Sequence, residues 1–426
     1  MIRSRNWLGI VVAAISGGLL VLLAINLWPA EPRVGKLPAK QYGVRDAQFL
    51  RAMGVLLGPG LVTGNSARAL YNGDEIFPAM LASIASAKRT ITFETYIYWS
   101  GDIGQAFAEA LSTRARSGVK VHVLLDWVGS GKMDDRLMKQ MLDAGVEIRK
   151  FHKPAWHTIS RMNNRTHRKL LVVDGAVGFT GGVGIAETWT GHAQDEKHWR
   201  DSHFEVRGPV VAQMQATFLE NWLKVTGEPL HGEAYFPHIE PVGSTAAQML
   251  SSSPDGGADS MELMYHVLIV AADRSIDLSM AYFVPDSMST DALVAALRRG
   301  VRVRIIVPGD ITDSQLVRAA SRRLWGPLLE AGAEIFEYQP TMYHCKVIIV
   351  DDFLVSVGST NFDTRSFRLN DEANLNIYDE KFASQQRVVF EKDLARARKV
   401  TLLDWANRPF WARIQELPGA LFGAQL

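Results

Sequence analysis

The sequence has almost no cysteine, because Cys345 is the only one among its 426 residues. A disulfide within the chain is therefore excluded, although one thiol does not indicate the compartment. A strong excess of charge of either sign is also missing, since the formal net charge is +1. A dedicated nucleic-acid-binding protein is usually more basic, so this balance argues against a nuclease. With 47% hydrophobic and 21% charged residues, the chain is long enough and apolar enough for two domains with substantial cores.

Charged side chains are absent from residues 7–28, which begin and end with tryptophan. About 20 apolar residues are needed to cross a bilayer core, and tryptophans favour its two interfaces. A cleaved signal peptide has a shorter apolar region of about 7–15 residues. The sequence therefore predicts a retained N-terminal transmembrane helix within residues 1–29. Basic residues lie on both sides of this stretch, so the side of the membrane that holds the rest of the chain stays open.

Three segments are predicted to connect or flank the body of the protein. Residues 30–69 begin with prolines and scattered basic residues and are interpreted as a linker. Residues 231–255 are rich in Gly, Pro and Ser and are interpreted as a second linker. Residues 405–426 mix aromatic and aliphatic residues with arginines, which predicts an amphipathic segment. This segment either docks on the body or lies at a membrane surface.

The body is an internal repeat, in which Gly118 corresponds to Gly300 and Gly145 to Gly332. Helical and strand patterns alternate in the same order in both copies, which is typical of a sheet covered by helices. The sequence predicts an α/β fold of two pseudo-symmetric halves, residues 70–230 and 256–404, each a mixed β-sheet flanked by helices. Strands are expected at residues 90–98, 118–126 and 145–148, and again at 275–283, 300–307 and 332–335.

Each half carries the same short motif: His-x-Lys, four apolar residues and an Asp. The candidate catalytic residues are His167, Lys169, Asp174, His344, Lys346 and Asp351. Side chains alternate between the faces of a strand, so the His and Lys of each motif are expected on one face and the residue between them on the other. An imidazole beside an ammonium suits a phosphate, because one group can attack or transfer protons while the other neutralises oxygen charge.

The motif aspartates are expected to have a different role. Each lies five residues beyond its lysine, roughly 16 Å away along a strand that rises about 3.3 Å per residue. Asp174 and Asp351 are each followed by a residue that favours a turn. Within the candidate catalytic set, we therefore expect these two to hold the turn rather than to touch the phosphate.

These motifs resemble the phospholipase D superfamily, which is defined by two His-x-Lys-x4-Asp motifs, and within it bacterial cardiolipin synthases. The resemblance covers roughly residues 70 to 415. It is carried by residues 165–175, 180–182, 199–203, 344–346 and 358–370 and by Glu94-Thr-Tyr-Ile. One position departs from the family pattern: Gly184 stands where an Asn is common, so only the second half supplies this amide, at Asn361.

The paired motifs allow one phosphate to be held by two histidines and two lysines. One histidine attacks phosphorus while the other protonates the leaving alkoxide and then deprotonates the acceptor. Both lysines, Ser359 and Asn361 are expected to bind the phosphate oxygens, and no metal or other cofactor is needed. The resemblance implies that the N-terminal histidine, His167, is the nucleophile. Asp201 and Glu372 are the candidates to orient the imidazoles.

The leading functional hypothesis is a membrane-anchored phosphatidyltransferase that makes cardiolipin from phosphatidylglycerol. Its expected partners are phospholipids and the membrane, with no nucleic acid, and its oligomeric state stays open. A phospholipase D hydrolase would use the same catalytic residues with water as the acceptor. A nuclease of the same superfamily is the third alternative, which the near-neutral charge and the apolar N-terminal stretch disfavour.

Overall fold

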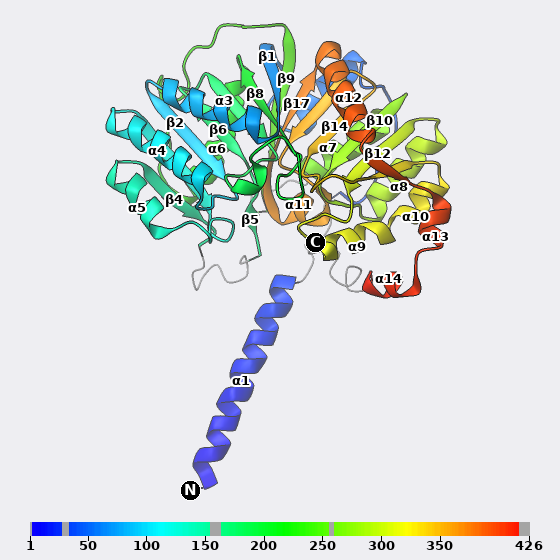
Figure 1. Cartoon of the computed structure of the whole chain (residues 1–426), viewed down its shortest axis with the longest axis horizontal. Coiled ribbons are helices and arrows are strands. Elements are labelled where there is room, and N and C mark those ends of the chain that lie inside the picture. Colours follow the sequence, from blue (N-terminus) through cyan, green and yellow to red (C-terminus); the bar gives the residue numbers. More distant parts are fainter. Residues whose placement is uncertain (1, 28–33, 154–162, 255–259, 417–426) are drawn as a thin grey trace.

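The protein is described by a computed structural model, which covers residues 2–27, 34–153, 163–254 and 260–416. Helix α1 (Ile2–Leu27) extends away from the body (Figure 1). Among the described residues, none of the helices combines the length and the apolar character that crossing a bilayer requires. The anchor predicted over residues 1–29 is therefore not confirmed and stays a prediction, as do the predicted limits of the linkers and halves.

Within the described residues, sixteen strands form one mixed sheet. From one edge to the centre, the second half contributes β18 (Ala397–Val400), β13 (Glu334–Tyr338), β12 (Arg302–Pro308), β10 (Ser275–Met280), β14 (Lys346–Val350), β15 (Leu354–Gly358), β17 (Asn370–Tyr378) and β9 (Thr245–Ser252). The first half continues with β1 (Val62–Tyr71), β8 (Ser202–Arg207), β7 (Val177–Gly181), β6 (Leu170–Val173), β2 (Thr90–Thr95), β3 (Lys120–Asp126) and β4 (Glu147–Phe151). The short strand β5 (Arg165–Thr166) pairs with β17, and β11 (Phe283–Val284) pairs with β16 (Phe362–Asp363).

The strand order shows the internal repeat directly. Read outward from the centre, the first half runs β1-β8-β7-β6-β2-β3-β4 and the second runs β9-β17-β15-β14-β10-β12-β13. The two sheets expected from the sequence are joined into one, because β1 and β9 pair antiparallel. Both central strands lie in stretches interpreted as linkers: most of β1 falls within residues 30–69, and β9 falls within 231–255.

Helices cover both faces of the sheet (Figure 1). Over one face lie α3 (Asn72–Ser86), α4 (Asp102–Arg116) and α5 (Asp135–Asp143) in the first half, and α7 (Ser260–Ala271), α8 (Ser287–Arg298) and α10 (Trp325–Glu330) in the second. Over the other face, α6 (Val210–Thr226) and α12 (Glu380–Leu394) pack into a single core that both halves share. The alternation of side chains builds this arrangement, since Leu171 and Val173 of β6 enter the first-half core while Leu170 and Val172 enter the shared one.

The remaining α-helices of the body are short. They are α2 (Ala47–Leu56), α9 (Gln315–Arg323), α11 (Thr364–Arg368), α13 (Leu402–Ala406) and α14 (Phe410–Gln415). The predicted C-terminal segment docks on the body as far as the structure describes it, because Trp405 Nε1 donates a hydrogen bond to the carbonyl of Arg322 at 2.6 Å. Residues 417–426 of that segment lie outside the described residues.

Candidate active site

The two motifs meet where the halves join. His167 lies between β5 and β6, and His344 lies just before β14. Each histidine is fixed by a backbone hydrogen bond to the opposite half: the amide of His167 donates to the carbonyl of Asp371 at 2.9 Å, and that of His344 to the carbonyl of Arg200 at 2.8 Å. The site therefore exists only when both halves of the chain are folded against each other.

The carboxylates that orient the histidines are also exchanged between the halves. His167 Nδ1 donates to Glu372 at 3.0 Å, and His344 Nδ1 donates to Asp201 at 2.7 Å. Both carboxylates are fully buried. With Nδ1 used in this way, Nε2 of each ring is the nitrogen available for chemistry. The orienting role of Asp201 and Glu372 stays a prediction, and the geometry pairs Glu372 with His167 and Asp201 with His344.

Both motif lysines are buried next to their histidines. Lys169 Nζ donates to the carbonyl of His167 at 2.7 Å, and Lys346 Nζ donates in the same way to His344 at 2.7 Å. Lys346 Nζ also lies 3.2 Å from His344 Nε2. Burial lowers the pKa of Lys169; the charge of Glu372 opposes this shift and the charge of Lys346 adds to it.

One cavity of about 520 Å³ connects the two motifs. Its walls include residues from both halves, namely Tyr96, Ile97, Trp99, Lys132, Arg165, His167, Lys169, Trp189, Trp199, Tyr282, Asp313, Val317, His344, Asn361, Asp363, Arg365, Ser366 and Asn370. The imidazole of His344 packs against Trp189 and Trp199, with ring centroids 5.3 Å apart in each case. The imidazole of His167 packs edge-on against Tyr96, also at 5.3 Å.

Burial sets the protonation of the bases in this cavity. It lowers the pKa of His167 to about 4, although the charge of Glu372 opposes the shift. Burial also lowers the pKa of His344, and the charge of Lys346 adds to this effect. Burial lowers the pKa of Lys169 to about 7. At neutral pH both imidazoles are thus neutral in the empty site, as a nucleophile and a general base require.

The orienting carboxylates stay ionised despite their burial. Burial by itself raises the pKa of Glu372, but His167, Lys169 and Ser359 together bring it below its usual value. The same balance holds the pKa of Asp201 low, because His344 and Lys346 outweigh the effect of burial. Each histidine therefore faces a negative charge that stabilises an imidazolium or a phosphorylated ring when one forms.

The motif aspartates hold turns, as the sequence predicts. The carboxylate of Asp174 accepts backbone N–H groups of residues 88–90, the nearest at 2.7 Å. The carboxylate of Asp351 accepts those of residues 273–275 at 2.7–2.8 Å. Both residues have positive φ, 52° and 54°, a conformation that Asp adopts more readily than most residues. Neither lines the cavity, so the geometry separates these two from the rest of the candidate catalytic set.

Ser359 and Asn361 were both expected at the phosphate, and the structure separates them. The hydroxyl of Ser359 donates to Glu372 and accepts from the amide of Ala373, and the residue does not line the cavity. Its expected contact with phosphate oxygens is therefore corrected to a contact with the carboxylate behind His167. Asn361 does line the cavity, and its buried Oδ1 has no hydrogen-bond partner.

The missing amide of the first half has a steric cause. A Cβ atom on Gly184, the counterpart of Asn361, would lie 2.7 Å from Cβ of Ile97 and 3.2 Å from the ring of Trp189. Apolar side chains therefore occupy the space that an Asn would need. The cavity consequently has unequal walls, although the backbone around it is nearly symmetric.

Two buried residues behind the first motif were given no role from the sequence. Arg168 is fully buried and donates to Glu220, to the carbonyls of Thr217 and Ser252 and to that of Glu372. Glu94 is also fully buried and accepts from Thr166 and Asn221, and burial raises its pKa to about 7. The family-like stretch Glu94-Thr-Tyr-Ile marked one of them, but a single sequence could not show which groups they contact.

The sequence indicated no metal-binding cluster. Among the described residues, one group of potential ligands does lie together: Glu262, His266 and Asp286. Both of its carboxylates face the guanidinium of Arg368, at 3.2 and 3.4 Å. None of the three lines the cavity between the motifs.

Comparison with known proteins identifies the family. The family model described as "Cardiolipin synthase, PLD-like domain" matches residues 80–222 and 265–394, one match in each half. The chain belongs to the cardiolipin synthase family of the phospholipase D superfamily. The fold agrees, because the crystal structure of a phosphatidylserine synthase from Haemophilus influenzae Rd KW20 superposes with a TM-score of 0.64 at 17% identity, over 84% of this chain and 94% of that one.

Two curated members of this family show how far the similarity extends. The chain is 35% identical to the major cardiolipin synthase ClsA of Bacillus subtilis (strain 168) over 357 residues, which is 83% of this chain and 73% of that protein. It is 37% identical to a cardiolipin synthase of Geobacillus kaustophilus (strain HTA426) over 350 residues, 82% of this chain and 70% of that one. The superfamily resemblance inferred from the two motifs is confirmed.

Proposed function

We propose that the protein is a phosphatidyltransferase that makes cardiolipin. It moves the phosphatidyl group of phosphatidylglycerol to a headgroup hydroxyl of a second phospholipid and releases glycerol. The observation that carries this proposal is the crossed arrangement of the site: two neutral imidazoles, each held by a buried carboxylate of the other half, face one cavity. A chain of the cardiolipin synthase family with this site has both groups that the transfer needs.

The first half-reaction breaks the bond between phosphorus and the glycerol oxygen. Nε2 of His167 attacks phosphorus and forms a phosphohistidine, while Nδ1 keeps its proton and its hydrogen bond to Glu372, whose negative charge stabilises the positive charge that forms on the ring. His344, protonated when the anionic substrate is bound and held by Asp201, gives its Nε2 proton to the leaving alkoxide. Glycerol then leaves with that proton.

The second half-reaction reverses these roles. Neutral His344 removes the proton of the acceptor hydroxyl, and the oxygen attacks the phosphorus on His167. The phosphorus–nitrogen bond breaks and His167 returns to its neutral form. Lys169, Lys346 and the amide of Asn361 supply positive charge and hydrogen bonds to the non-bridging oxygens throughout, and Ser359 supports Glu372.

Lipid analysis after incubation with phosphatidylglycerol alone tests this function. Formation of cardiolipin and glycerol in a 1:1 ratio supports the transferase. Phosphatidic acid and glycerol, with no cardiolipin, would instead show that water is the acceptor and that the protein is a hydrolase. The control is the Asp310→Asn variant, in which the altered carboxylate pairs with Arg318 outside the cavity, and which should behave as the unaltered protein does.

We also propose that the protein acts at the cell membrane, held by the uncharged stretch within residues 7–28. Phospholipid substrates favour this location, because a soluble domain would have to extract each lipid from the bilayer. A variant that lacks residues 1–29 should lose its association with membranes in flotation on a density gradient. It should keep its activity on short-chain phosphatidylglycerol in solution. Unchanged flotation of the truncated protein would show that another segment holds the membrane.

A further inference from the structure

The two halves give the cavity walls of different chemistry. In the first half the wall includes Ile97, beyond β2, and Lys132, beyond β3, whose Nζ lies 3.9 Å from the ring centroid of Trp99. In the second half the corresponding wall carries Tyr282, beyond β10, and Asp313, beyond β12. Ile97 and Tyr282 each stand two residues beyond the end of equivalent strands. The second-half wall therefore carries a carboxylate, whereas the first-half wall carries an ammonium group.

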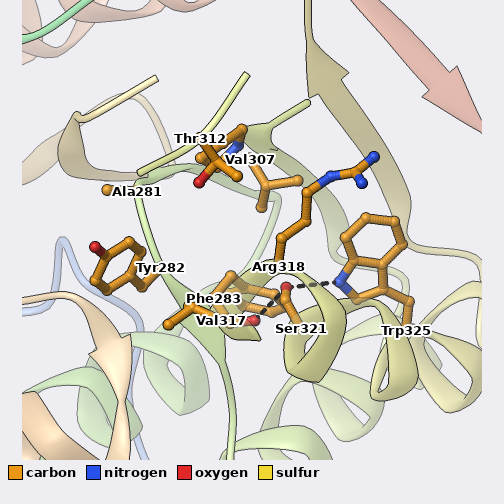
Figure 2. A pocket seen from close by; sticks show the side chains of 10 residues that line it. Ala281, Tyr282, Phe283, Val307, Thr312, Val317, Arg318, Ser321 and Trp325 are labelled. Carbon is orange, nitrogen blue, oxygen red and sulfur yellow. Dashed lines mark hydrogen bonds between the residues drawn. The ribbon is translucent and has the colours of Figure 1, made fainter. Parts of the chain in front are cut away.

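Asp313 is held in place but not neutralised. Its carboxylate accepts a hydrogen bond from the hydroxyl of Tyr282 at 2.5 Å, and its side chain is exposed to the cavity. No described lysine, arginine or histidine forms an ion pair with it. The nearby Arg318 is used elsewhere, since it pairs with Asp310 and Glu337 at 2.7 Å each. Figure 2 shows the guanidinium of Arg318 on the Trp325 side of the small pocket that Tyr282 also lines.

The position of Asp313 puts its charge next to one catalytic pair. The carboxylate acts to raise the pKa of both His344 and Lys346, against the larger effect of burial. The hydroxyls of Tyr282 and Thr312 donate to this carboxylate but leave its charge in place. Beside a phosphodiester that charge is unfavourable unless a group of the ligand also donates to it. An uncharged donor such as a hydroxyl does so without bringing in further negative charge.

A second acceptor faces the same space. Asn361 is 4% exposed and lines the cavity, and its Oδ1 has no hydrogen-bond partner among the described residues. Buried polar atoms are rarely left without a partner in proteins, so this atom also calls for a donor on the ligand. Asp313 and Asn361 are thus two acceptors that the second half contributes to the cavity.

We propose that Asp313, fixed by Tyr282, and Oδ1 of Asn361 form a subsite for the hydroxyl groups of a polyol headgroup beside His344. The subsite receives the glycerol that leaves in the first half-reaction and the glycerol headgroup of the acceptor in the second. Its position beside His344 fits both events, because that residue exchanges a proton with the headgroup oxygen each time. This assignment rests on the proposed function and identifies Asp313 and Asn361 as the residues that select a lipid with a polyol headgroup.

The test compares two short-chain donors in single-turnover headgroup release, which needs no acceptor. Phosphatidylglycerol has free hydroxyls on its headgroup, and phosphatidyl-1-propanol has none. In the unaltered protein, we expect the second-order rate constant to be higher for phosphatidylglycerol. Asp313→Ala should lower that constant about tenfold or more, as loss of a hydrogen bond to a charged group does, and leave the constant for phosphatidyl-1-propanol unchanged or raised.

Two further variants keep the test decisive. Tyr282→Phe removes only the hydroxyl that holds Asp313, so it should also lower the preference for phosphatidylglycerol over phosphatidyl-1-propanol, by a smaller factor than Asp313→Ala. If Asp313→Ala does not fold, Tyr282→Phe serves as the test. Asp310→Asn alters a carboxylate of the same loop outside the cavity and should keep the full preference. Equal losses on both donors, or an unchanged preference, would overturn the subsite. That result would leave the proposed function standing as long as the unaltered protein makes cardiolipin from phosphatidylglycerol.

Discussion

The two halves of the molecule share a strand order but differ around the histidine that each contributes. Behind His167, the carboxylate of Glu372 is supported by the hydroxyl of Ser359 and by the amide of Asn370 at 3.2 Å. Behind His344, the carboxylate of Asp201 is supported by the indole of Trp189 at 3.0 Å and by a backbone amide. A symmetric backbone thus holds two histidines in unequal surroundings.

The residues between each His and Lys show the same inequality. Arg168 is fully buried and binds groups of α6, β9 and β17, so the first motif is tied to the second half by a charged side chain. Its counterpart Cys345 is a buried thiol whose pKa burial raises to about 12. The repeated strand order thus provides the geometry for two histidines, and the side chains around each one make the two positions chemically different. A transfer that needs one nucleophile and one proton carrier fits such a site.

The largest effects are expected from the histidines themselves. His167→Ala and His344→Ala should each lower turnover of phosphatidylglycerol by about 10³-fold or more, since nucleophile and acid are both essential. A phosphatidyl ester of p-nitrophenol separates the two, because this leaving group needs no proton. We expect a burst of p-nitrophenolate from His344→Ala and none from His167→Ala. Equal bursts from the two variants would mean that the histidines are interchangeable.

Loss of an orienting carboxylate should cost less. Glu372→Gln and Asp201→Asn should each lower turnover by about 10²-fold, because the imidazole loses the charge that fixes its tautomer. With the p-nitrophenyl ester as donor, release of p-nitrophenolate should still be slow in Glu372→Gln, whose nucleophile is affected. It should be fast again in Asp201→Asn, because this leaving group needs no proton from His344. The matched control is Asp195→Asn, which alters a pair with His198 at 2.7 Å outside the cavity. Recovery of Glu372→Gln instead would exchange the roles of the two pairs.

The plot of kcat/KM against pH should fall at both ends, on the acid side because His167 gains a proton and on the alkaline side because Lys169 loses one. Below the pKa of His167, about 4, the nucleophile is protonated and activity is lost. Above the pKa of Lys169, about 7, the lysine is neutral and binds the phosphate less well, so activity falls again. Lys169→Arg should weaken the alkaline limb while lowering the maximum, because a guanidinium keeps its proton whereas His344 still has to carry one in the first half-reaction. An alkaline limb of unchanged shape in Lys169→Arg would assign it to groups other than Lys169.

The motif aspartates should affect stability rather than chemistry. Asn tolerates positive φ, so Asp351→Asn and Asp174→Asn keep the backbone conformation and lose only the charge. We expect the free energy of unfolding, measured with urea, to fall by about 1–3 kcal/mol, more for the buried Asp351 than for the partly exposed Asp174. Activity per folded molecule should stay within a few-fold. A stable Asp351→Asn protein with a thousandfold lower turnover would place the carboxylate in the chemistry.

The smallest effect is expected from chelation. Two lysines and an amide already supply positive charge and hydrogen bonds to the phosphate, so EDTA should leave activity on a soluble short-chain substrate unchanged. The soluble substrate is needed because divalent ions also alter the packing of anionic lipids. Loss of activity that one particular ion restores would mean that a metal takes part.

Much of the fold could be predicted, because the repeat places apolar strands and amphipathic helices in the same order twice. The central strands β1 and β9 could not. Val62–Tyr71 and Thr245–Ser252 are rich in small and polar residues and resemble linkers, and their strand character comes from pairing with each other and with β8 and β17. The secondary structure of such segments is determined by contacts between residues far apart in the chain, and local sequence patterns do not show these contacts.

The candidate site also has a part that the sequence predicts and a part that it does not. The histidines, the lysines and the turn-holding aspartates can be predicted from spacing alone, because each motif is a short local pattern. The crossing of Glu372 to His167 and of Asp201 to His344, and the burial of Ser359 behind Glu372, depend on how the halves dock. Asp313 could not be predicted from the sequence, since a single carboxylate in a polar loop forms no recognisable pattern.

His167 alone is expected to carry the phosphatidyl group, and trapping the intermediate tests this assignment most directly. The protein is mixed with phosphatidylglycerol labelled at phosphorus, quenched in alkali within milliseconds, digested, and sequenced by mass spectrometry. We expect label on the peptide that contains His167 and none on the peptide that contains His344, with the His344→Ala variant still labelled when the p-nitrophenyl ester is the donor. Label on His344, or equal label on both, would contradict it.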